Sequence, residues 1–153
     1  MTDKPDFMMQ TYIRCTRAAL WHALTDADTY AHWDFLGQTA TRDPKDALLV
    51  RYALPDGSEL LHTRDLVVEP MSRLETTFEP KWDDVTTPSR VVYRIEEEGD
   101  FCILTVEHHG LNNDPEGGTA DGWTRSLAGL KTYLETGKPA NFGGAYLFEE
   151  QGQ

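Results

Sequence analysis

The chain begins with alternating residues and then changes to a helical period. Residues 7–14 (FMMQTYIR) predict a strand. Thr16 follows as an N-cap for a helix over residues 17–24, whose apolar side chains recur on one face at helical spacing. Asp26 and Asp28 after this helix offer a cap for a second short helix over residues 29–35. Two small helices are therefore predicted directly after the first strand.

The middle of the chain has the two-residue period and the turn signals of β-hairpins. Strands are predicted over residues 47–54, 59–69, 74–79, 90–96 and 101–109. Turn sequences such as Pro-Asp-Gly and Gly-Asp separate successive strands. Strands joined by such turns run antiparallel, so an antiparallel sheet is predicted.

A long amphipathic helix is predicted near the end of the sequence, over residues 120–136, and Gly137 followed by Pro139 ends it. Its apolar stripe consists of Trp123, Leu127, Leu130 and Leu134. The predicted fold class is α+β. In this arrangement a curved antiparallel sheet wraps around the long C-terminal helix, which lies across the concave face.

Length and charge limit the classes of partner. With 153 residues, of which 39% are hydrophobic and 26% charged, we expect one domain over residues 1–153, with its core at about 8–139 and a tail at 140–153. The 26 acidic residues outnumber the 14 basic ones, for a net charge of -12. Such a surface repels phosphate backbones and anionic lipid headgroups, so no nucleic acid and no membrane is expected as a partner.

The N-terminal residues and the cysteines bear on location. The first residues are polar and lack the basic start and apolar core of a signal peptide, so we expect a cytoplasmic location. Cys15 and Cys102 have no CxxC spacing. In a reducing compartment we expect both to be thiols of the hydrophobic core.

Motifs for catalysis and cofactor binding are missing from the sequence. The serines have no G-x-S-x-G setting, and the histidines have no H-E-x-x-H or comparable metal-ligand spacing. The glycines lack the strand-to-helix arrangement of a phosphate-binding loop. We therefore predict no catalytic nucleophile, no metal site and no cofactor.

Aromatic residues on separate elements are the stronger functional signal, because aromatic walls with a few polar groups are typical of small-molecule sites. Strand alternation predicts that His62, Arg64 and His108 also point to the inner face, where Arg64 pairs with a carboxylate of the protein or of a ligand. Phe35 and Trp82 belong to the same aromatic set. The alternative is that these side chains only fill the core. The candidate ligand-binding residues are Trp33, Tyr52, His62, Arg64, Phe78, Tyr93, His108 and Trp123.

Four phrases, in this order, carry a family resemblance over residues 12–139: YIRCTRAALWHALTDADTYAHW, LVVEPMSRLETTF, PSRVVYRIEEEGDFCILTVEHHGL and GWTRSLAGLKTYLETGKP. Together they resemble the START-like helix-grip superfamily called SRPBCC. Within it they are similar to the branch homologous to the C-terminal domain of the activator of the heat-shock ATPase. The resemblance implies a helix-grip fold with a cavity between the sheet and the C-terminal helix, which in many relatives holds an apolar or aromatic small molecule.

Three classes of function fit these observations. The favoured class is a domain that binds an apolar or aromatic small molecule with one anionic or hydrogen-bonding end. The second is an enzyme of the cyclase or dehydratase kind, in which at least two of His62, Arg64, Tyr93 and His108 converge on the ligand. The third is an interaction module that acts on a chaperone ATPase. The aromatic tail over residues 141–148 is expected to dock on its own domain or across a homodimer.

Overall fold

The computed structural model describes residues 4–34, 38–81, 88–111 and 119–142. Within these residues, seven strands form one antiparallel sheet in the order β1-β7-β6-β5-β4-β3-β2. The strands are β1 (Phe7–Ile13), β2 (Thr39–Asp43), β3 (Asp46–Ala53), β4 (Glu59–Glu69), β5 (Arg73–Pro80), β6 (Ser89–Glu98) and β7 (Phe101–His109). The helices are α1 (Arg17–Thr25), a 3-10 turn (Ala27–Thr29), α2 (Tyr30–Trp33) and α3 (Thr119–Thr136).

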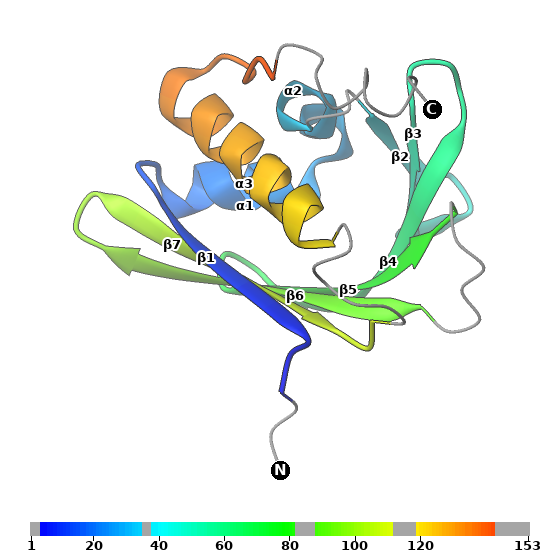
Figure 1. Cartoon of the computed structure of the whole chain (residues 1–153), viewed down its shortest axis with the longest axis horizontal. Coiled ribbons are helices and arrows are strands. Elements are labelled where there is room, and N and C mark those ends of the chain that lie inside the picture. The colour runs from blue at the N-terminus through cyan, green and yellow to red at the C-terminus, as the bar shows by residue number, and fades with distance from the viewer. Residues whose placement is uncertain (1–3, 35–37, 82–87, 112–118, 143–153) are drawn as a thin grey trace.

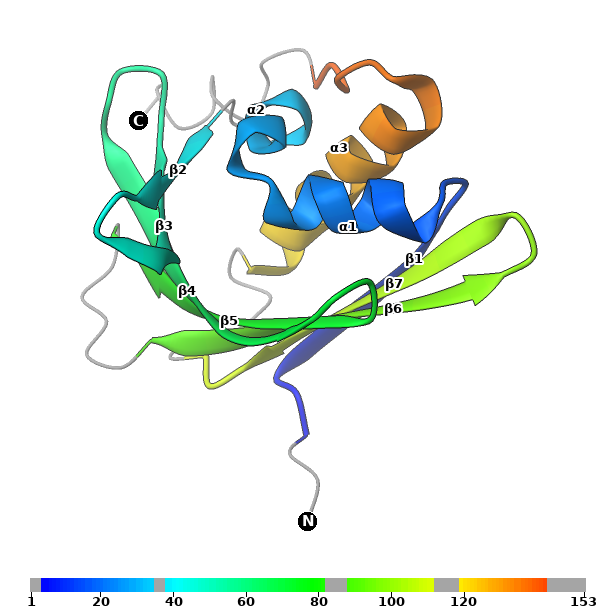
Figure 2. The same cartoon turned by 180° about the vertical axis from the view of Figure 1, so that it is seen from behind.

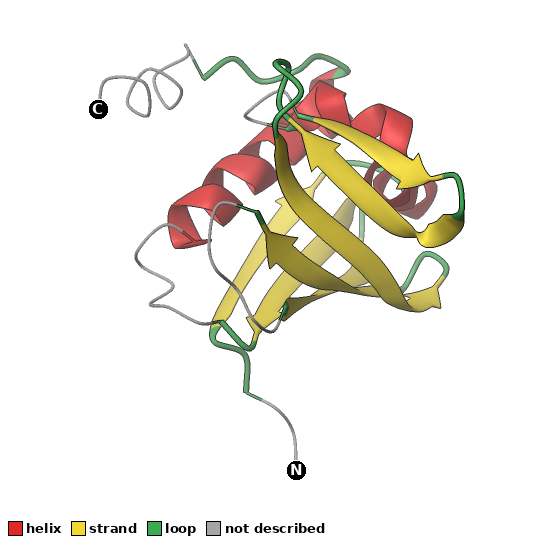
Figure 3. Ribbon diagram, turned by 90° about the vertical axis from the view of Figure 1, so that its right-hand side faces the viewer, coloured by secondary structure: helices red, strands yellow, loops and turns green. Residues whose placement is uncertain are grey.

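The sheet is strongly curved, and the helices lie on its concave side (Figures 1 and 2). One end of the sheet is formed by β1 and β7, and the other end, with β2 and β3, bends up beside α2 (Figure 1). The view from the side shows the strands wrapping around the helices (Figure 3). The predicted α+β class and its helix-grip arrangement are confirmed. No described helix combines the length and the apolar character needed to cross a membrane.

The first helices begin at the caps that the sequence predicts. The Oγ1 atom of Thr16 accepts a hydrogen bond from the backbone N–H of Ala19 at 3.1 Å, at the start of α1. A carboxylate oxygen of Asp26 accepts one from the backbone N–H of Asp28 at 2.9 Å, and this bond starts the 3-10 turn. Each cap satisfies a backbone donor that the helix itself leaves without a partner. The second helical segment therefore begins at residue 27, two residues before the predicted start.

Strand β2 is an element that the hydrophobic pattern does not predict. Its sequence, TATRD, contains Ala40 as its one apolar residue, so there is no hydrophobic alternation to recognise. The strand pairs with β3 and forms an edge of the sheet. Pairing with β3 thus stabilises a segment whose own sequence carries little strand signal.

The hydrophobic core lies between α3 and only part of the sheet. On α3, Trp123, Leu127 and Leu130 are buried, and Leu134 packs against them, as the stripe predicts. Cys102 is buried and Cys15 is half-buried against the same core, as expected. The sheet residues of this core come from β1, β6 and β7: Ile13, Val91, Ile95, Cys102, Leu104 and Val106. The apolar stripe of α3 therefore packs on the half of the concave face formed by β1, β6 and β7, and it leaves the half formed by β2 to β5 uncovered.

Helices α2 and α3 approach each other closely at Gly129. A Cβ atom placed on Gly129 would overlap the carbonyl oxygen of Trp33 at the end of α2, so only glycine allows this contact. The ring of Phe142, at the start of the predicted aromatic tail, lies 3.9 Å from the same Cβ position. The rest of that tail lies outside the described residues. Because Trp33 is buried beside the uncovered half of the sheet, this contact also positions α2 for the site described below.

The close contact at Gly129 predicts opposite effects of alanine at two positions in α3. Gly129→Ala should lower the free energy of unfolding by about 1–3 kcal/mol, because backbone must move to admit the methyl group. Gly122→Ala has nothing within 4 Å of its Cβ and should leave stability unchanged or raise it by up to about 1 kcal/mol, through helix propensity. Urea unfolding followed by circular dichroism measures both variants. Equal stabilisation by the two alanines would contradict the close contact.

Candidate functional site

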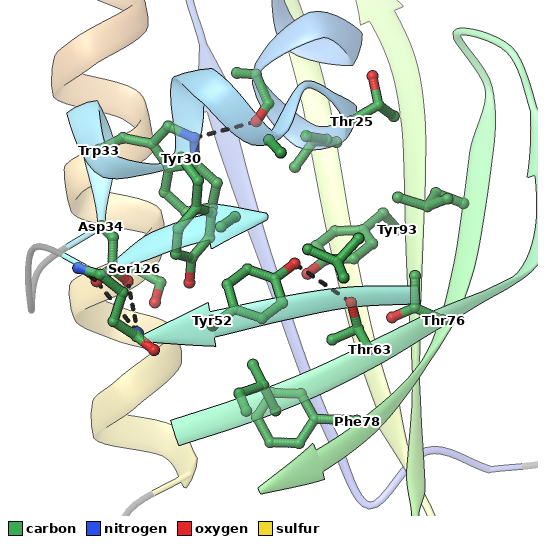
Figure 4. A pocket seen from close by; sticks show the side chains of 18 of the residues that line it. Thr25, Tyr30, Trp33, Asp34, Tyr52, Thr63, Thr76, Phe78, Tyr93 and Ser126 are labelled. Atoms are coloured by element: carbon green, nitrogen blue, oxygen red, sulfur yellow. Dashed lines mark hydrogen bonds between the residues drawn. The ribbon is translucent and has the colours of Figure 1, made fainter. Parts of the chain in front are cut away.

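A cavity of about 520 Å³ lies over the half of the sheet that α3 leaves uncovered (Figure 4). Strands β2 to β6 form one side of it. The end of α1, the 3-10 turn, α2 and the first half of α3 form the other side. Its volume falls within the range of roughly 300–1,000 Å³ that is typical of small-molecule sites.

Aromatic rings from α2, α3 and the strands line this cavity. The rings of Tyr30 and Trp33 meet edge to face at 4.7 Å, and those of Tyr30 and Tyr52 at 4.8 Å. Tyr30 is not among the predicted site residues, although its spacing of three from Trp33 in one short helix puts both residues on the same face. Among the predicted site residues, the structure brings together Trp33, Tyr52, Phe78, Tyr93 and Trp123. Their contact with a ligand stays a prediction, and Phe35 and Trp82 lie outside the described residues.

The predicted inward orientation of His62 and Arg64 is wrong. The Nε2 atom of His62 lies 3.3 Å from a carboxylate oxygen of Glu59, and neither residue lines the cavity. Arg64 pairs with Asp46. A carboxylate of the protein is thus its partner, one of the two kinds of partner that the sequence predicts, but neither residue of the pair lines the cavity.

Register explains this error on β4. Leu60 and Leu61 are adjacent, so hydrophobic alternation can assign either face to the interior. In the sheet, Tyr52 pairs with Leu61, and a register shift follows Asp65. The inward positions after Leu61 are then polar, because Thr63 and Asp65 line the cavity. Placing the apolar residues of β4 inside the fold therefore assigns the wrong polar residues, His62 and Arg64, to the inner face.

His108 points inward as predicted, but it belongs to the packing beside the cavity rather than to its lining. Trp123 Nε1 donates a hydrogen bond to His108 Nδ1 at 3.1 Å, so the proton of the neutral ring is on Nε2. That Nε2 lies 2.7 Å from Ser89 Oγ, which in turn donates to the carbonyl oxygen of Phe78 at 3.2 Å. Burial lowers the pKa of His108 to about 4. The ring is held neutral and connects α3 to the sheet.

The charged pair at the cavity wall is Arg42 with Asp65, which the sequence analysis did not identify. Arg42 Nη1 lies 3.3 Å from an Asp65 carboxylate oxygen, and Nη2 donates to the carbonyl oxygen of Thr25 at 3.1 Å. Burial raises the pKa of Asp65, and the charge of Arg42 opposes this effect. Ala40 and Arg42 are two residues apart on β2, so strand alternation puts both on the face that lines the cavity. This inference is possible only once the segment is known to be a strand.

Several hydroxyl groups supply the remaining polarity of the cavity. The hydroxyl oxygen of Tyr52 lies 3.4 Å from Thr63 Oγ1, and Tyr93 lines the wall nearby (Figure 4). Burial raises the pKa of Tyr30, Tyr52 and Tyr93 above the ordinary value, so all three phenols are neutral at physiological pH. The cavity therefore presents aromatic walls with neutral groups that can donate or accept hydrogen bonds.

The family profile described as Activator of Hsp90 ATPase homolog 1-like protein (AHSA1) matches residues 14–135. The chain belongs to the AHSA1-like family. The match covers most of the segment in which the sequence phrases show the same resemblance. Comparison of this AHSA1-like chain with curated protein sequences gives no significant match.

Solved structures share the fold of this AHSA1-like chain. CalU16 from Micromonospora echinospora is 22% identical, with a TM-score of 0.65 over 95% of this chain and 82% of CalU16. DynU16, from the dynemicin biosynthetic locus, is 23% identical, with a TM-score of 0.72 over 88% of this chain and 49% of DynU16. The Aha1 dimer from Colwellia psychrerythraea is 16% identical, with a TM-score of 0.66 over 86% of this chain and 97% of that one. At these identities the comparison shows a common fold.

The buried imidazole of this AHSA1-like chain predicts a loss of stability in acid. His108 has a pKa of about 4 in the folded state and about 6.5 when unfolded, so the unfolded chain binds the extra proton between these values. The stabilisation is complete above pH 6.5 and falls by about 3 kcal/mol as the pH drops to 4. Urea unfolding at a series of pH values measures this slope.

His108→Gln is the control for that titration. Glutamine can accept and donate hydrogen bonds but does not titrate, so the variant should lose the part of the acid slope that His108 contributes. Surface carboxylates contribute equally to both profiles. Parallel pH profiles of the two proteins would show that His108 is not the group responsible.

Proposed function

We propose that this AHSA1-like protein binds a largely apolar, aromatic small molecule in the cavity over β2 to β5, without transforming it chemically. The observation that carries the proposal is the cavity of about 520 Å³ with aromatic rings from α2, α3 and the sheet in its walls. The aromatic side chains of the wall already contact each other edge to face, and the ring of an aromatic ligand can contact them in the same way. Apolar contact would supply most of the affinity, and the polar groups would orient the ligand.

The charge distribution supports a neutral ligand. Arg42 is already paired with Asp65, so an incoming carboxylate would have to compete with a carboxylate of the protein. Arg64, which the sequence predicts to meet a carboxylate of the protein or of a ligand, does not line the cavity. Of the two kinds of polar end that the sequence analysis allowed, the hydrogen-bonding one therefore fits this site better.

Binding without catalysis is supported by the chemistry of the lining. Of the groups suggested for acid and base catalysis, Tyr93 lines the cavity and His62, Arg64 and His108 do not. Among the described lining residues there is no histidine, cysteine, lysine or glutamate. The raised pKa of Tyr93 makes its phenolate a rare species at physiological pH. Of the described lining carboxylates, Asp34 is hydrogen-bonded by Gln38 and Asp65 is paired with Arg42, so the set of groups suggested for a cyclase does not converge in this cavity.

Other roles stay predictions. The family description and the dimeric Aha1 neighbour keep a chaperone contact and a homodimer as candidates, whereas DynU16, from a biosynthetic locus, is a neighbour that supports a small-molecule role. The cytoplasmic location expected from the sequence also stays a prediction.

The proposed function predicts that filling the cavity abolishes binding of an aromatic probe. Calorimetric titration with 2-methoxynaphthalene should give a dissociation constant below millimolar for the unaltered protein. Ala40→Phe places a ring inside the cavity and should weaken binding at least tenfold. Thr41→Phe, an exposed position on the same edge strand, is the matched control and should leave binding unchanged.

Thermal unfolding should confirm that both variants are folded before the titrations are compared. Equal binding by the Ala40→Phe and Thr41→Phe variants would place the probe outside this cavity. Failure of the unaltered protein to bind naphthalene probes below millimolar concentration would contradict the proposed function and favour the interaction module.

A further inference from the structure

A buried polar corner of the cavity is built around the carboxylate of Asp34. The backbone N–H of Gln38 donates to Asp34 Oδ2 at 2.9 Å, and Gln38 Nε2 lies 3.3 and 3.2 Å from the two carboxylate oxygens. Asp34, Gln38 and the neighbouring Tyr30 all line the cavity. Two donor groups of Gln38 thus hold the Asp34 carboxylate in place.

These bonds fix which way the Gln38 amide faces. If the amide were turned over, its oxygen would face the Asp34 carboxylate, and two acceptors would oppose each other. The Nε2 atom therefore stays on Asp34, and Oε1 occupies the other branch of the amide, directed away from that carboxylate. Gln38 is only 6% exposed, and its Oε1 has no hydrogen-bond partner.

An unpartnered buried acceptor is unusual in a folded protein and is unfavourable. Other polar groups in this cavity wall pair with each other, as in the bonds of Arg42 to Asp65 and of Tyr52 to Thr63. Gln38 differs from them because the Nε2 atom of its amide is hydrogen-bonded and the Oε1 atom is not. Gln38 lines the cavity, and the terminal torsion of glutamine is soft, so the amide can adjust its orientation to a molecule bound there.

We propose that Gln38 Oε1 is the acceptor for a neutral hydrogen-bond donor on the ligand, a hydroxyl or an N–H attached to its aromatic part. This inference rests on the proposed function, because it needs a ligand in the cavity. The Asp34 carboxylate acts as a positioning group by holding the amide in one orientation. The ligand is therefore an aromatic molecule with a donor at the end that enters this corner.

The test compares two probes that share a ring system and differ in one donor. 2-Naphthol carries a hydroxyl, and 2-methoxynaphthalene has the same oxygen without its hydrogen. The unaltered protein should bind 2-naphthol about fivefold to tenfold more tightly, as expected for one hydrogen bond to a buried acceptor. In Gln38→Met, 2-naphthol should lose this advantage, and the affinity for 2-methoxynaphthalene should change little.

Thr76→Val is the matched control. Thr76 lines the same cavity, and valine keeps its shape while removing the hydroxyl, so the preference for 2-naphthol should persist. Loss of the preference in Thr76→Val, or its persistence in Gln38→Met, would overturn the assignment to Gln38. Equal binding of both probes by the unaltered protein would overturn the inference but leave the proposed function standing. Binding of neither probe would overturn the proposed function itself.

A measurement on the unaltered protein covers the case in which Gln38→Met does not fold. The side-chain amide resonances of Gln38 should shift in a nitrogen–proton correlation spectrum when 2-naphthol is added, and shift less with 2-methoxynaphthalene. Identical shifts with the two probes at saturation would overturn the inference.

Discussion

The hydrogen bond from Trp123 to His108 joins α3 to one half of the sheet, and the cavity lies beside this contact. Through Ser89 the bond continues to the backbone of β5, so a buried polar chain connects the helix with the concave face. The apolar stripe of α3 then packs on β1, β6 and β7. The stripe does not reach β2 to β5, so the cavity lies between that half of the sheet and the helices.

The uncovered half can stay open because its polar groups largely satisfy each other. Arg42 is neutralised by Asp65, and Tyr52 shares a hydrogen bond with Thr63. These pairs reduce the cost of polar side chains in a partly dry space. The core between α3 and β1, β6 and β7 supplies apolar burial elsewhere, so stability and the cavity rest on separate halves of the same sheet.

Membership in the AHSA1-like family accounts for the fold, whereas the character of the site depends on individual positions. The same architecture supports different functions, so the residues that face the cavity carry the functional argument. Several of them come from short elements, such as Arg42 on the edge strand β2, and Tyr30 on α2. Gly129 links these residues to the core, because it lets α2 lie directly against α3.

Local signals in the sequence were sufficient for most of the elements and for part of the site. The caps at Thr16 and Asp26 and the stripe on α3 depend on residues close in sequence, and the structure confirms them. The inward position of Tyr93 on β6 also follows from alternation, because that strand presents a consistently apolar face to the interior.

Tertiary structure alone decided the face of β4, the presence of β2 and the polar corner. Alternation identifies an inward face only where that face is apolar, and here Thr63 and Asp65 line a cavity instead of a core. The pairing of β4 with β3 and β5 selected the face. Asp65 meets Arg42, a residue 23 positions away, through strand pairing that neither segment encodes by itself. The unpartnered oxygen of Gln38 likewise exists only because the fold buries the amide and turns its nitrogen toward Asp34.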